Sequence, residues 1–285
     1  MLTLVFWDVQ HGSAAYIKTP NGKHIVVDLG TGSYSDDNLE FSPLLHLKNK
    51  WNVKQLDGVI ITHPHRDHLD DILNFGELKP KVLVRPKHLN EDEIRAGNRK
   101  EDTTIIDKYL EVNSEYVHPV SPSENPFLDD NNGGVRFVRF IPSSCATSNL
   151  NNHSVVTIVS YAKSKIIIPG DNEPPSWNEL LEQEEFLTAI KDTDILVAPH
   201  HGRDSGFSSA LFEYINPRLT IISDGRFCDT SATDRYAKHT KGWTVYKRSG
   251  GKEERKCVTT RNDGVIVVKF GMNSNERPFI EVTID

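Results

Sequence analysis

The chain has 285 residues, of which 37% are hydrophobic and 26% charged, and its formal net charge is −7. A chain of this composition can bury a globular core without disulfides, and its negative charge argues against binding nucleic acid through the overall field, although a local basic patch could hold a phosphate. Its three cysteines form no CxxC pair, which argues against a disulfide framework or a thiolate zinc site and favours a reducing compartment.

The N-terminal residues do not resemble a targeting segment, because they lack a basic region and reach an acid at Asp8. No stretch approaches the roughly 20 apolar residues of a transmembrane helix. We therefore expect a cytoplasmic protein without a membrane partner, formed by one domain over residues 1–285.

The first third of the chain alternates strand-like runs with turns. Strands are expected at residues 2–9, 14–19, 24–29, 56–62 and 82–85, with a turn at 20–23 that makes the second and third a hairpin. Helices are expected at 42–50, where Ser42 is a suitable N-cap and Pro43 occupies the first helical position, and at 69–75.

The middle of the chain is more polar. Residues 90–107 are strongly charged and weakly apolar, which predicts a partly helical surface excursion, and residues 121–134 are rich in turn formers. The segment 90–134 is therefore a candidate lid or insertion.

The second half returns to strands. These are expected at residues 135–141, 154–161, 165–168, 194–198, 219–223, 243–247, 265–270 and 279–284, with helices within 174–190 and at 208–215 and 233–239. No repeat of 20–50 residues stands out, which argues against a solenoid. The pattern predicts an α/β protein in which sheet packs on sheet with helices outside.

A dense metal-binding signal follows the strand at 56–62. His63, His65, Asp67 and His68 fall within six residues at its C-terminal end, where loops are positioned by a rigid sheet. Imidazole and carboxylate suit zinc, manganese or iron. One tight turn cannot easily direct four side chains at one ion, but it can divide them between two ions about 3.5–4 Å apart, as in many phosphoesterases.

This HxHxDH run resembles the signature of the metallo-β-lactamase superfamily. Other segments resemble, in order, the β-lactamase-like domain of ComEC-type competence proteins: DVQHGSA at 8–14, TPNGK at 19–23, VDLG at 27–30, NNHSVV at 151–156, IPGD at 168–171, APHHG at 198–202 and TTRNDGVI at 259–266. The resemblance implies the metallo-β-lactamase fold, a four-layer αββα sandwich, and a metal-dependent hydrolase.

The resemblance also implies roles for particular residues. Two divalent ions, zinc or manganese, are expected, with His63, His65 and His153 on the first, Asp67, His68 and His200 on the second, and Asp171 bridging them. Asp28 would orient ligands from behind. The alternative for His153 is a surface residue beside Asn152. The choice between His200 and His201 is close; the sequence favours His200 as the ligand and leaves His201 to donate a proton or bind phosphate.

One motif departs from the ComEC-type pattern. The QGD of that family appears here as His11-Gly12-Ser13, so the acid is missing and an imidazole stands two residues before it. His11 is a candidate proton donor beside the site, and the alternative is an ordinary polar loop residue.

The ComEC-type resemblance favours phosphodiesters as substrates, because it implies a nuclease. A water bridging two cations would attack phosphorus, with Asp67, Asp171 and His201 as the catalytic residues. The most basic stretch, an apparent insertion at 247–261, offers Lys247, Arg248 and Lys252 as contacts to phosphates, unless it is a solvated hairpin loop. We expect nucleic acid or a nucleotide as the substrate; the alternatives are a hydrolase of a small nucleotide, thioester or lactam, and a non-catalytic metal-binding regulatory module.

Overall fold

The structure is a computed structural model that describes residues 1–32, 41–225 and 231–285. Cys228 lies outside the described residues; Cys145 is partly buried and Cys257 is buried, and both are free thiols. Within the described part of the chain, no helix is both long enough and apolar enough to cross a bilayer.

The described strands form two mixed sheets. The larger contains, in spatial order, β12 (Lys252–Arg255), β11 (Trp243–Lys247), β15 (Pro278–Ile284), β14 (Ile266–Met272), β1 (Leu2–Phe6), β2 (Ala15–Lys18), β3 (His24–Val27), β4 (Gly58–Ile60) and β5 (Val82–Val84). The smaller contains β13 (Cys257–Thr259), β10 (Leu219–Ile222), β9 (Ile195–Val197), β8 (Ser164–Ile168), β7 (Val156–Tyr161) and β6 (Arg136–Phe140). Pairing is parallel along β3–β4–β5 and along β8–β9–β10–β13.

The helices lie mostly outside these sheets. They are α1 (Pro43–Asn49), α2 (Glu91–Ala96), α3 (Thr103–Glu115), α4 (Asp129–Asn132), α5 (Pro174–Leu181), α6 (Glu184–Ile190), α7 (Thr233–Lys238) and α8 (Thr260–Asp263). The 3-10 turns are η1 (Arg66–His68), η2 (Asp70–Leu78), η3 (Lys100–Asp102), η4 (Pro122–Glu124), η5 (Leu150–His153), η6 (His200–Gly202), η7 (Asp204–Gly206) and η8 (Ala210–Glu213).

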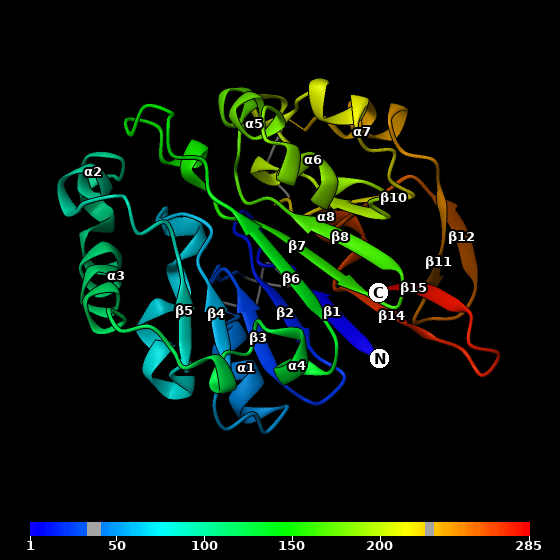
Figure 1. Cartoon of the computed structure of the whole chain (residues 1–285), viewed down its shortest axis with the longest axis horizontal. Coiled ribbons are helices and arrows are strands. Elements are labelled where there is room, and N and C mark those ends of the chain that lie inside the picture. Colours follow the sequence, from blue (N-terminus) through cyan, green and yellow to red (C-terminus); the bar gives the residue numbers. More distant parts are fainter. Residues whose placement is uncertain (33–40, 226–230) are drawn as a thin grey trace.

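Three apolar clusters define the layers. Alternation along β1 puts Leu2 and Leu4 into the cluster between the two sheets and Val5 into a second cluster on the outer face of the larger sheet, which α1, η2 and α3 cover. A third cluster packs α5, α6 and α7 on the outer face of the smaller sheet. The order helix, sheet, sheet, helix confirms the predicted αββα sandwich, with α5–α7 above the sheets in Figure 1.

Several predicted elements differ in detail. Residues 69–75 and 208–215 contain 3-10 turns (η2 and η8) instead of α-helices, and 174–190 contains two helices. The charged segment 90–107 is not a mere surface excursion, because Ile94 and Ile106 are buried in the cluster that α3 shares with η2. The strands β12 and β13 were not predicted, since β12 reads Lys-Glu-Glu-Arg and has no apolar alternation.

Candidate metal centre

The ends of central strands from both sheets meet at one edge of the sandwich. Asp28 follows β3, and one of its carboxylate oxygens accepts a hydrogen bond from the backbone N–H of Thr62 after β4 (2.7 Å). The carbonyl of Thr62 in turn accepts from the N–H of Val155 just before β7 (2.9 Å), which ties the two sheets together. The sequence motifs that follow these strands therefore converge, as strand-end loops do in layered α/β folds.

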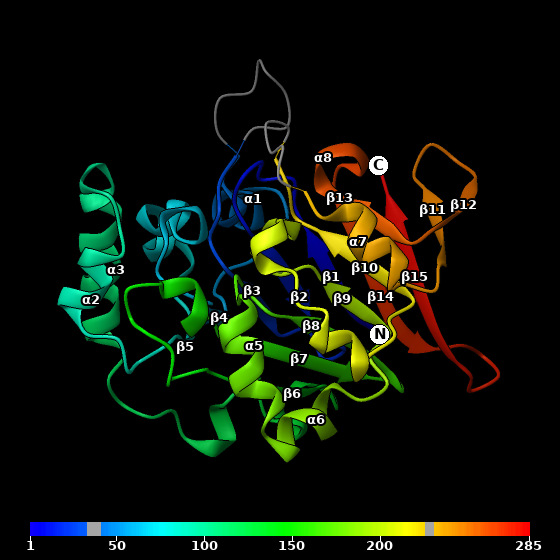
Figure 2. The same ribbon diagram turned by 90° about the horizontal axis from the view of Figure 1, so that it is seen from above.

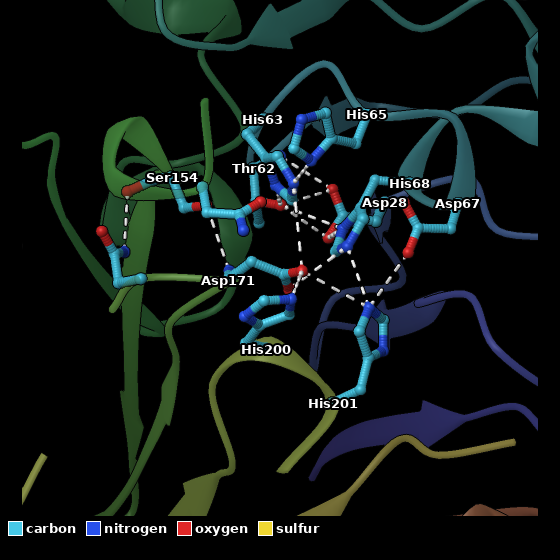
Figure 3. Close-up of polar contacts among 12 residues, drawn as sticks. Asp28, Thr62, His63, His65, Asp67, His68, Ser154, Asp171, His200 and His201 are labelled. Atoms are coloured by element: carbon cyan, nitrogen blue, oxygen red, sulfur yellow. Dashed lines mark hydrogen bonds and ion pairs between the residues drawn. The ribbon is translucent and has the colours of Figure 1, made fainter. Parts of the chain in front are cut away.

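Asp171 lies at the centre of the converging side chains (Figure 3). Its carboxylate oxygens are 3.2 Å from Nε2 of His68, 3.4 Å from Nε2 of His201 and 4.0 Å from Nε2 of His63. Asp67 completes the group, with an oxygen 3.3 Å from Nε2 of His201. Ligand atoms of Asp67, His68, Asp171 and His201 all lie within 4.8 Å of one another, a spacing suited to one ion. These four residues are called the metal group below.

Hydrogen bonds to Nδ1 of His68 and of His201 orient both buried rings so that Nε2 of each faces Asp171. Nδ1 of His68 lies 2.8 Å from a carboxylate oxygen of Asp28, and Nδ1 of His201 lies 3.1 Å from the carbonyl oxygen of Ser223. Because each Nδ1 faces an acceptor, each Nδ1 carries the proton and donates it. The Nε2 atoms of both rings then point at each other and at carboxylates, an arrangement that needs positive charge between them, from a proton or from a metal ion.

The pKa shifts of His68 and His201 are those expected at a site for a cation. Burial disfavours a charged ring at His201, yet the carboxylates of Asp171 and Asp67 raise its pKa to about 10. The same carboxylates, with Asp28, raise the pKa of His68 well above its usual value against the effect of burial. Two buried carboxylates thus draw positive charge to these nitrogens, and a divalent ion supplies that charge to neutral rings. The residues present fit a divalent cation of the kind that the fold implies.

His63 and His65 form a second donor group next to the first. Nε2 of His63 lies 2.9 Å from Nδ1 of His65, and burial, together with the neighbouring His68 and His65, keeps the pKa of His63 well below its usual value. Asn151 lies beside His65, and its buried side-chain oxygen has no hydrogen-bond partner among the described residues. His63, His65 and Asn151 therefore lie side by side next to the first group, and Nε2 of His63 comes within 4.0 Å of Asp171.

The turn after β9 decides between the two neighbouring histidines. His200 (φ 50°) and His201 (φ 54°) are both left-handed, a conformation that costs an L residue about 1–2 kcal/mol, and such strain gathers at functional sites. The turn buries His201 within the Asp171 group. His200 instead faces Glu173, with its Nδ1 3.1 Å from the carboxylate, and its Nε2 is 3.9 Å from Asp171. Geometry therefore favours His201 as the ligand, the reverse of the sequence-based choice.

His153 is buried, and its polar contact is with His88. Its Nδ1 lies 2.9 Å from Nε2 of His88, just after β5, and it is not among the side chains that surround Asp171. The structure pairs His153 with His88 and shows no contact between His153 and Asp171 among the described residues, so ligation of the first ion by His153 stays a prediction. The adjacent turn of η5 turns Asn151 toward His65 instead.

A cavity of about 640 Å³ opens over the metal group. Its lining includes His65, Asp67, Asp171, His200 and Asn151, together with His11 and three arginines, Arg66, Arg99 and Arg203. Residues 97–102 between α2 and α3 form one wall, held by hydrogen bonds from Asn98 to the carbonyl of Pro64 (2.8 Å) and from Arg66 to Asp102 (3.1 Å). The predicted lid segment thus contributes a wall of the cavity.

His11 lies at the rim of this cavity, half-exposed. Its Nε2 accepts a hydrogen bond from Arg203 (2.9 Å) and lies 3.7 Å from Asp67, while its ring stacks on His201 at 5.3 Å. Burial and the neighbouring His201 lower its pKa. A neutral His11 ring that accepts a hydrogen bond from Arg203 is better suited to orient that guanidinium than to donate a proton to a substrate.

The basic hairpin lies elsewhere. Lys247 pairs with Glu253 (2.9 Å) and Arg248 with Asp285, and neither these two nor Lys252 lines the cavity. In Figures 1 and 2 the β11–β12 hairpin is at the opposite end of the molecule from α2 and α3, which flank the cavity wall. The structure does not bring Lys247, Arg248 and Lys252 to the metal group.

Sequence reasoning missed three contributors to the site. Asn151 belongs to the NNHSVV element, in which His153 is the more obvious metal ligand. Arg203 directly follows the PHHG element, and its closeness to the ligands could have identified it. Glu173, two residues after Asp171, holds His200, and only the folded geometry reveals that pairing.

The chain is similar to known proteins of one family. The family model of the metallo-beta-lactamase superfamily matches residues 7–222. A Thermotoga maritima protein of known structure, classed as a Zn-dependent hydrolase of that superfamily, aligns with a TM-score of 0.43 and 14% identity over 90% of this chain and 97% of its own.

Three curated relatives also match. Uncharacterized protein YcaI of Escherichia coli is 26% identical over 83% of this chain and 27% of its own length. Recombination protein 2 of Haemophilus influenzae is 25% identical (77% and 24%), and ComE operon protein 3 of Bacillus subtilis is 23% identical (77% and 28%). The chain spans about a quarter of the length of each, and the match bears out the ComEC-type resemblance.

Proposed function

The chain belongs to the metallo-beta-lactamase superfamily and is a metal-dependent hydrolase with a His/Asp metal-binding cluster, and we propose that it hydrolyses phosphodiester bonds in a nucleic acid or a nucleotide. The observation that carries the substrate class is the cavity over the metal group, which Arg66, Arg99 and Arg203 help to line. Arg66 is paired with Asp70 and Asp102, whereas Arg99 and Arg203 have no carboxylate partner among the described residues and can meet a phosphate. Two relatives add support, since one is named for recombination, a process of DNA, and the other for the ComE operon.

Asp67, His68 and His201 would hold one ion, and His63, His65 and Asn151 the other, with Asp171 shared between them. When bound, divalent ions supply the Lewis acidity that activates water and offsets charge on phosphate oxygens. Asp28 and the carbonyl of Ser223 hold His68 and His201 in the tautomer that presents Nε2 to the ion. Asp67 and Asp171 therefore act as ligands in this scheme.

His200 is better placed than His201 to donate a proton to the leaving oxygen. It lines the cavity, and its Nδ1 is held by Glu173 (3.1 Å) and Ser205 (3.0 Å), so its Nε2 is directed toward Asp171 and the cavity. A carboxylate behind an imidazole orients the ring, an arrangement found for general acids.

The proposal is tested by an activity screen of protein supplied with Mn²⁺ or Zn²⁺. The substrates are single-stranded DNA, duplex DNA, RNA and bis(p-nitrophenyl) phosphate, and the Asp171→Ala variant controls for contaminating nucleases. Cleavage of a polymer by the unaltered chain alone supports a nuclease, and cleavage of the small diester alone supports a nucleotide phosphodiesterase. Absence of cleavage in protein with a full complement of metal would refute phosphodiester hydrolysis.

A further inference from the structure

Arg203 is fixed beside the metal group by its own backbone. It follows the η6 turn directly, and its N–H donates to the carbonyl of His200 (3.0 Å) while its carbonyl accepts from Gly206 (3.1 Å). A β-bridge to Ser231 adds a third restraint. The same turn that buries His201 therefore sets the position of the Arg203 side chain, which lines the cavity.

The guanidinium of Arg203 has few partners. Its Nη2 donates to His11 (2.9 Å), its buried Nε has no hydrogen-bond partner, and no described carboxylate lies within ion-pair distance of it. Arg66, in the same cavity, is bound by both Asp70 (2.8 Å) and Asp102 (3.1 Å). A cation whose charge and donors are left partly unsatisfied costs the fold stability, so its placement is not explained by folding alone.

Four of the five carboxylates that line the cavity have other tasks. Asp67 and Asp171 surround the candidate ion, and Asp70 and Asp102 hold Arg66. The fifth, Glu101, is not within ion-pair distance of Arg203, which leaves the charge of Arg203 for a ligand in the cavity. A planar guanidinium with several donors matches the oxygens of a phosphate better than any neutral carbonyl.

From this placement we propose that Arg203 is a specificity-determining residue that binds a non-bridging phosphate oxygen of the substrate, with His11 orienting its guanidinium. The inference rests on the proposed function and narrows it. It requires an anionic phosphodiester as the preferred substrate and disfavours neutral lactams, thioesters and phosphotriesters.

The test compares one anionic and one neutral substrate. Arg203→Gln should lower kcat/KM for bis(p-nitrophenyl) phosphate at least tenfold, whereas it should change kcat/KM for the neutral diethyl p-nitrophenyl phosphate less than twofold. Arg203→Lys should recover part of the lost kcat/KM, because lysine restores the positive charge but not the planar set of donors of a guanidinium. Arg95→Gln, on α2 and paired with Glu91 and Asp107, is the control and should match the unaltered chain on both substrates. Equal losses on both substrates, or none on the diester, would overturn the proposal.

A binding measurement separates this proposal from the proposed function. Inorganic phosphate is titrated calorimetrically into metal-replete protein, with metal content measured for each variant. We expect Arg203→Gln to weaken phosphate binding at least tenfold at equal metal content. If the unaltered chain hydrolyses neither substrate, phosphodiester hydrolysis fails, yet the titration still decides Arg203. Equal affinity in both proteins, or no phosphate binding by the unaltered chain, would exclude the role.

Discussion

The Nε2 atoms of His68 and His201 lie 3.3 Å apart in the folded chain, although 133 residues separate the two histidines in sequence. Each ring is buried, and each is fixed from behind through Nδ1, by Asp28 and by the carbonyl of Ser223. Two nitrogen lone pairs at this distance, with the carboxylate of Asp171 beside them, are stable only with positive charge between them.

Substitution of His200 and substitution of His201 should have different effects on the number of metal ions bound per chain. His201→Ala removes a buried ligand and should lower the bound metal from two ions per chain to about one. His200→Ala should retain both ions but lose about 10²–10⁴-fold in rate, the usual contribution of a general acid. Elemental analysis of purified proteins, combined with steady-state rates, measures both effects. Loss of metal in His200→Ala with full metal in His201→Ala would reverse the assignment.

Asn151 should behave as a ligand, and His153 should not. We expect Asn151→Ala to lower the bound metal by about one ion per chain, because the side-chain oxygen beside His65 is removed. Asn151→Asp keeps an oxygen there and should retain two ions. His153→Gln is the matched comparison from the same turn, and its metal content should equal that of the unaltered chain. The opposite pattern in the same elemental analysis would restore His153 as the ligand.

Asp28 should control metal affinity without contacting the ion. Its carboxylate accepts from His68 and from Thr62, so Asp28→Asn weakens the support of one ligand. Loss of such a supporting group typically weakens metal binding 10–100-fold. Competition with a chromophoric chelator measures the affinity. Asp57→Asn, at the start of the β3–β4 pair, is the control, since Asp57 binds Lys23 and the His24 N–H far from the metal group. Equal affinity in Asp28→Asn and the control would contradict the role.

Metal should also stabilise the fold. An ion present at 100 times its dissociation constant adds about 2.7 kcal/mol to the free energy of unfolding. For a chain of this size that is a rise of roughly 5–10 °C in Tm. Differential scanning fluorimetry with and without a chelator should show this rise in the unaltered chain and a smaller one in Asp171→Ala. Equal shifts in the two proteins would place the stabilising ion elsewhere.

Gly202 should be intolerant of any side chain. It has a φ of 71°, and a Cβ there would lie 2.7 Å from Cγ2 of the buried Ile222. We expect Gly202→Ala to cost about 2 kcal/mol or more of stability, through strain and a close contact. Urea denaturation measures the loss. Gly76→Ala, where a Cβ meets nothing within 4 Å, is the comparison and should be nearly neutral. A similar small effect in both variants would show that the turn can relax.

The sequence predicted the layers and most of the metal group because both depend on local patterns. Strand-end motifs bring Asp28, His63 and Asp171 to one edge of the sandwich wherever the exact strand limits fall. The sequence could not predict whether His200 or His201 is the metal ligand, because the answer depends on two consecutive residues with left-handed backbone, which no residue propensity predicts. The role of His153 stays a prediction, because the one-turn 3-10 segment η5 decides whether Asn151 or His153 faces His65, and no local pattern encodes that choice. The position of Arg203 directly after the PHHG element was a usable signal, but its lack of a carboxylate partner among the described residues exists only in the fold.

Anomalous diffraction from crystals of the metal-replete protein, measured at the absorption edge of the bound metal, tests the two-ion centre most directly. The account predicts two peaks that share Asp171, one among Asp67, His68 and His201 and the other among His63, His65 and Asn151. A single peak, or ions bound away from Asp171, would contradict it.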